Sequence, residues 1–88
     1  MKKVIVYFSE HCKDCGPLKA ALDEAGIKYA PVDISSGMFP LKQFLKYRDH
    51  RAEFDLIKEK GQVGVPCIVV NDGEQILFSV PEDLDVLR

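Results

Sequence analysis

Apolar and polar positions alternate in blocks along the chain, and the spacing within each block predicts its secondary structure. Residues 4–8 form a continuous β-branched and aromatic run, which is typical of a strand covered on both faces. The next apolar residues recur at helical spacing and predict a helix over residues 16–25 that ends at Gly26. Residues 27–34 return to a strand pattern. Because Pro31 has no N–H, we expect this strand at the edge of a sheet.

The second half of the chain predicts a helical segment, a hairpin and a last helix. We expect helices over residues 38–49 and 52–60 and strands over residues 68–70 and 74–78. A final helix should follow, with Pro81 in its first turn. The turn-forming residues Asn71-Asp72-Gly73 predict that the last two strands pair antiparallel. The first half of the chain is a βαβ unit, for which a parallel, right-handed crossover is expected.

Length and charge narrow the class of protein. The 88 residues predict one small domain, residues 1–88, with a thin core. A net charge of −2 gives no electrostatic case for binding nucleic acid or an acidic membrane surface. No apolar stretch approaches the roughly 18 residues of a membrane span, and the apolar run near the start lacks a signal-peptide cleavage site. We therefore expect a cytoplasmic protein that binds no membrane and is a monomer.

Two cysteines lie three positions apart where the first strand gives way to the first helix, in the stretch Cys12-Lys13-Asp14-Cys15. Pro17 is tolerated only in a first helical turn, so the helix either begins near Asp14 or begins at Cys12 and bends. One turn of backbone brings two Cα atoms within the roughly 4.4–6.8 Å that a disulfide needs. The unpaired N–H groups of a helix start make a nearby sulfur easier to ionise. The spacing therefore indicates thiol–disulfide exchange, with Cys12 as the attacking thiolate and Cys15 as the resolving thiol.

A third cysteine, Cys67, leaves two hypotheses open. Three cysteines cannot all pair within one chain. Cys67 is either a small buried hydrophobe at the start of a strand or, since it follows Pro66, a third redox thiol or metal ligand. The alternative function is a metal- or iron–sulfur-cluster-binding module that uses Cys12, Cys15 and Cys67. His11 is a further candidate ligand, a residue that tunes Cys12, or simply a solvent-facing loop residue.

The chain resembles the glutaredoxins, within the thioredoxin-fold superfamily. The resemblance rests on the Cys12–Cys15 motif after the first strand, on Val65-Pro66 before the third, and on the order of elements over nearly the whole chain. It implies an α/β fold of the glutaredoxin type, with a four-stranded mixed sheet flanked by helices. In this family the proline follows a cis peptide bond and lies against the cysteine pair. By this resemblance Val65 offers backbone groups to a substrate, and we place Lys13, Val65 and Pro66 in the substrate-binding set.

The resemblance implies an enzyme, a glutaredoxin-like disulfide oxidoreductase that reduces protein or glutathione-mixed disulfides. Its redox-active disulfide would join Cys12 and Cys15, and it would need no bound cofactor and no metal. Glutathione or a flavin-dependent reductase would restore the dithiol.

Three features depart from the usual glutaredoxin pattern. Ser9 stands where a lysine commonly binds a glutathione carboxylate, and Phe78-Ser79-Val80-Pro81 replaces a Gly-Gly pair. Residues 78–83 are more similar to the glutaredoxin-like electron donors of ribonucleotide reductase, which thioredoxin reductase reduces. Residues 41–61 are longer than the usual segment between strands 2 and 3, and predict an extra helix there.

Overall fold

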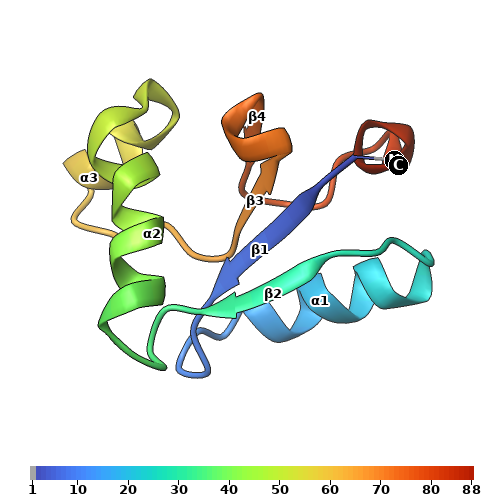
Figure 1. Ribbon diagram of the computed structural model, residues 1–88, viewed down its shortest axis with the longest axis horizontal. Helices are drawn as coiled ribbons and strands as arrows, with labels where there is room; N and C mark the ends of the chain where they lie inside the picture. Colours follow the sequence, from blue (N-terminus) through green and yellow to red (C-terminus); the bar gives the residue numbers. More distant parts are fainter. Residues whose placement is uncertain (1) are drawn as a thin grey trace.

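A four-stranded mixed sheet forms the centre of the fold, with helices packed on both of its faces (Figure 1). The computed structural model describes residues 2–88. Its strands are β1 (Val4–Phe8), β2 (Ala30–Asp33), β3 (Cys67–Val70) and β4 (Gln75–Leu77). Its helices are α1 (Cys15–Glu24), α2 (Met38–His50) and α3 (Asp55–Glu59), and its 3₁₀ turns are η1 (Ala52–Phe54), η2 (Asn71–Gly73) and η3 (Leu84–Leu87). Within residues 2–88 we find no helix with the length and apolar character needed to cross a bilayer.

The strand order is β2-β1-β3-β4, which confirms the predicted fold class. β1 pairs parallel with β2 and antiparallel with β3, and β3 pairs antiparallel with β4. The proline-containing strand β2 lies at an edge, as its sequence predicted. The helical segment between β2 and β3 consists of α2, η1 and α3.

Two hydrophobic clusters, one on each face of the sheet, bury β1 from both sides. The cluster on the α1 face contains Val4, Val6, Leu18, Leu22, Ile27, Ile68, Val70 and Leu87. The cluster on the face covered by α2 and α3 contains Tyr7, Ile34, Phe44, Phe54, Cys67, Val69 and Ile76. Successive side chains of β1 and β3 therefore enter opposite clusters, as strand geometry requires.

Helix α1 begins at Cys15, with Asp14 as its N-cap, so Pro17 lies in the first turn. This is the first of the two arrangements that Pro17 allowed, and it leaves Cys12 just before the helix. Proline is compatible with this position because the first backbone N–H groups of a helix have no intrahelical partner.

The predicted start of the second strand, residue 27, was wrong because Ile27 forms part of the C-terminal cap that follows α1. Gly26 adopts a left-handed φ of 73°. Its N–H donates to the Asp23 carbonyl, and the Ile27 N–H donates to the Leu22 carbonyl at 3.0 Å. This pair of bonds is a Schellman motif, which also packs Ile27 against Leu22 in the core. The extended strand begins only at Ala30.

The predicted final helix was also wrong in its start and its type. The chain forms only the 3₁₀ turn η3, and Pro81 lies before it. Asp83 sets the start of this turn, because its carboxylate accepts a hydrogen bond from the Asp85 N–H at 3.0 Å. Leu87 then enters the cluster on the α1 face.

We expect Gly64→Ala to lower the free energy of unfolding by about 3 kcal/mol, because the substitution meets two obstacles. Gly64 has a φ of +104°, and an added Cβ would lie 2.9 Å from Phe54 Cε1. Gly61→Ala is the matched control, since Gly61 has a φ of +70° but nothing within 4 Å of the added Cβ. It should cost about 1 kcal/mol. Equal losses for the two variants in urea unfolding would show that Phe54 does not restrict this position.

Candidate active site

The two cysteines of the Cys-x-x-Cys motif lie together but differ in exposure. Cys12 is half-buried in the loop after β1, where its N–H donates to the Ser9 carbonyl at 3.0 Å. Cys15 is the first residue of α1 and is only 2% exposed. Burial, and after it the neighbouring Cys12 side chain, raise the pKa of the Cys15 thiol to about 11. Cys15 therefore remains a neutral thiol near pH 7.

The cis-proline turn before β3 lies against Cys12. The Cys12 thiol donates to the Val65 carbonyl oxygen at a sulfur–oxygen distance of 3.6 Å. The Val65–Pro66 peptide bond is cis, as the resemblance implied, and Pro66 is buried. Two segments more than fifty positions apart, the loop after β1 and the loop before β3, thus meet at one end of the sheet.

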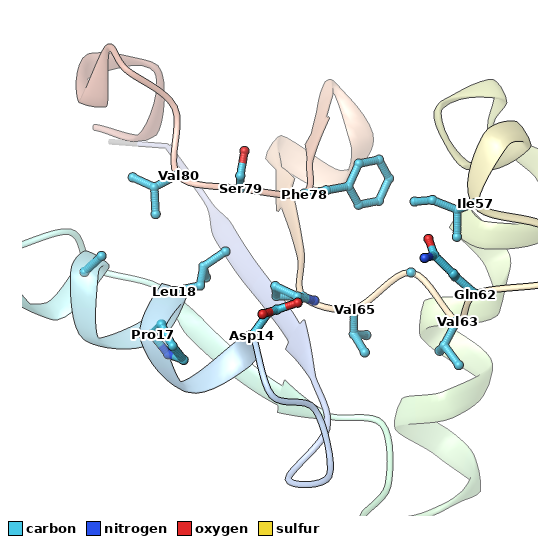
Figure 2. A pocket seen from close by; sticks show the side chains of 13 residues that line it. Asp14, Pro17, Leu18, Ile57, Gln62, Val63, Val65, Phe78, Ser79 and Val80 are labelled. Carbon is cyan, nitrogen blue, oxygen red and sulfur yellow. The ribbon is translucent and has the colours of Figure 1, made fainter. Parts of the chain in front are cut away.

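The structure has two grooves on either side of this meeting point. The first, which we call the α1 groove, has a volume of about 700 Å³ and is shown in Figure 2. It is lined by Asp14, Pro17, Leu18 and Ala21, by Ile57 and residues 62–66, and by Phe78, Ser79 and Val80. The second, the α2 groove, has a volume of about 470 Å³ and is lined by Ser9, His11, Cys12, Ile34, Ser35, Leu41, Val63 and Val65. Val63 and Val65 separate the grooves and line both.

Other predicted site residues lie at the edge of this region or outside it. Lys13 is exposed and lines neither groove. The His11 side chain is 80% exposed, with its Nε2 3.5 Å from a Glu10 carboxylate oxygen. Ser9, which replaces the usual lysine, shares a hydrogen bond of 2.6 Å with the Ser35 hydroxyl and so joins the loops that follow β1 and β2.

Cys67 is a core residue in this structure. It is 0% exposed and lies in the same cluster as Tyr7, Phe44 and Phe54. Burial, and after it the negative charge of Glu53, raise the pKa of its thiol to about 12. Among residues 2–88 no three His, Cys, Asp or Glu side chains are grouped so that they could hold a metal ion. The three-cysteine ligand set of the alternative hypothesis is therefore not assembled here.

Sequence reasoning missed Gln62 and Val63, which precede Val65-Pro66 and line the α1 groove. Their position directly before the predicted turn is the signal that could have found them. It also missed Leu41, whose place in the α2 groove depends on how α2 packs and has no local signal.

The sheet order, a dithiol at the start of α1 and a cis-proline before β3 together define a protein of the thioredoxin fold. The chain matches the family model described as Glutaredoxin over residues 4–76, and it belongs to the glutaredoxin family. It is similar to an uncharacterized protein of Haemophilus influenzae, with 39% identity over 77 residues that cover 88% of this chain and 90% of the relative. Membership of the family indicates a thiol–disulfide oxidoreductase.

The raised pKa of Cys67 predicts a specific pH dependence of stability. A buried thiol whose folded pKa lies above the unfolded value of 9.0 stabilises the protein below pH 9, and this contribution is lost as the pH rises towards about 12. We expect reduced wild-type protein to lose more stability between pH 7 and pH 10.5 than Cys67→Ala does, by about 2 kcal/mol. Urea unfolding of both proteins at the two pH values measures this difference. Parallel pH profiles would contradict it.

Proposed function

We propose that this protein reduces disulfides through a two-step dithiol mechanism. The Cys12 thiolate attacks one sulfur of a substrate disulfide, forms a mixed disulfide and releases the first substrate thiolate. Cys15 then loses its proton and attacks the Cys12 sulfur, which releases the second substrate thiolate and leaves a Cys12–Cys15 disulfide. Two electrons pass from the dithiol to the substrate.

The observation that carries this proposal is the unequal burial of two adjacent thiols. Cys12 is half-buried and borders the α2 groove, whereas Cys15 lies behind it at 2% exposure. Since burial raises the pKa of Cys15 to about 11, Cys15 keeps its proton near pH 7. Of the two sulfurs, the half-buried Cys12 sulfur beside the groove is the one that a substrate disulfide can reach, which makes Cys12 the first nucleophile.

The lining of the grooves favours a protein disulfide as the substrate. In the part of the chain that the structure describes, the α1 groove has one charged lining residue, Asp14. Glutathione carries two carboxylates and one ammonium, so its net charge has the same sign as Asp14, and the hydroxyl of Ser9 supplies no positive charge to bind a carboxylate. A peptide strand instead needs backbone partners, which Val65 can offer. We therefore propose a flavin-dependent reductase rather than glutathione as the main reductant. We further propose that the enzyme is cytoplasmic and monomeric and needs no bound cofactor or metal.

Substitution of each cysteine tests the mechanism. In an insulin-reduction assay we expect Cys12→Ser to lose at least about 100-fold in turnover, because the attacking sulfur is gone. Cys15→Ser should still attack but should accumulate a mixed disulfide with the substrate, detectable by mass spectrometry. Cys67→Ser serves as the control and should stay within about twofold of wild type, since Cys67 lies in the core.

The same assay, run with two coupled reductants, tests the proposed partner. We expect faster turnover with NADPH and thioredoxin reductase than with glutathione and glutathione reductase. The reverse preference would contradict the role given to Asp14 and Ser9.

Full activity of Cys12→Ser would contradict the mechanism itself.

A further inference from the structure

We propose that Arg48 is a positioning residue that holds the segment Gln62–Val65 in the conformation that binds substrate, an inference that rests on the function proposed above. Arg48 lies in α2, far from the cysteines in sequence. Its Nε donates to the Val63 carbonyl at 2.7 Å, and its Nη2 donates to the Gln62 carbonyl at 2.8 Å. Its side chain is only 23% exposed, and it reaches two carbonyls of an exposed segment.

The segment has two further points of attachment, one at each side of the Arg48 contact. At its start, α3 ends in a Schellman motif in which the Gln62 N–H donates to the Ile57 carbonyl at 3.0 Å. Beyond Val63, Gly64 lies against the Phe54 ring so closely that a Cβ would not fit. Arg48 binds the two consecutive carbonyls between these points. The fork of a guanidinium suits such a pair, whereas the single nitrogen of a lysine does not.

The contact with Arg48 affects both grooves, because residues 63 and 65 of the segment line both of them. Val63 and Val65 line the α1 groove and the α2 groove, and the Val65 carbonyl accepts the hydrogen bond from Cys12. A substrate strand that pairs with this backbone binds best when the segment is already ordered. Without Arg48 the segment must be ordered at the moment of binding, so the cost should appear in substrate affinity rather than in the exchange step.

The role of Arg48 also gives the long segment between β2 and β3 a function beyond packing. Arg48 comes from α2, and Phe54 and Ile57 come from η1 and α3. All three contact residues 62–64, so this helical segment serves as the support for the cis-proline loop.

The test is the kinetics of Arg48→Gln with two kinds of disulfide. With insulin as substrate we expect KM to rise about tenfold while kcat stays within about twofold. With 5,5′-dithiobis(2-nitrobenzoate), which reaches Cys12 without pairing to the segment, the second-order rate constant should stay within about twofold of wild type. Arg48→Lys, which keeps the charge but not the fork, should give an intermediate KM for insulin.

Arg51→Gln is the matched control, because Arg51 makes a similar contact elsewhere. Its Nη1 donates to the Gly73 carbonyl at 2.6 Å, and its Nη2 lies 2.9 Å from Glu53. Loss of this contact should destabilise the fold but leave KM for insulin within about twofold of wild type. An unchanged KM in Arg48→Gln, or equal KM increases in Arg48→Gln and Arg51→Gln, would overturn the proposal.

Amide hydrogen exchange separates this inference from the proposed function, since it needs no activity. In Arg48→Gln the amide of Gln62, which donates to the Ile57 carbonyl, should exchange about tenfold faster than in wild type, while the amides of β3 keep their rates. Unchanged exchange at the Gln62 amide overturns the positioning role. The two proposals can fail separately. If wild-type protein reduces no disulfide, the proposed reaction is wrong. If the segment nevertheless exchanges faster in Arg48→Gln, Arg48 still orders the loop.

Discussion

The contact between the Cys12 thiol and the Val65 carbonyl is the constraint around which the site is built. It follows from the pairing of β1 with β3, in which Tyr7 lies opposite Cys67. The end of β1 is therefore adjacent to the start of β3, and the loops that extend from these ends are brought together. One carries the dithiol and the other carries the cis-proline. The grooves on either side exist because α1 and α2 cover opposite faces of the sheet (Figure 1).

Burial assigns different chemistry to three thiols that are identical as free side chains. Cys67 lies in a hydrophobic cluster and Cys15 at the start of a helix, and in both cases loss of water favours the neutral thiol. Cys12 remains half-buried beside a groove, where a substrate sulfur can approach it. The fold thus separates one attacking sulfur from a resolving thiol and from a core residue by small differences in depth.

Local sequence patterns predicted much of this arrangement. The errors fall where contacts between residues distant in sequence determine the structure. The apolar run of β1, the dithiol at the start of α1 and the turn before β4 depend on neighbouring residues, so the sequence was sufficient to predict them. Ile27 has the pattern of a strand but caps α1, because its burial against Leu22 outweighs its β-propensity. The contacts of Arg48 join residues 14 and 15 positions apart through side-chain and backbone atoms, and no sequence pattern indicates them.

The most direct test of the account is the order in which the three thiols react in the reduced wild-type protein. Brief treatment with iodoacetamide near pH 7, followed by peptide mass mapping, measures the alkylation rate of each cysteine. The account predicts that Cys12 is alkylated first, with Cys15 and Cys67 slower by roughly tenfold or more. Alkylation of Cys15 or Cys67 at a rate equal to that of Cys12 would contradict it.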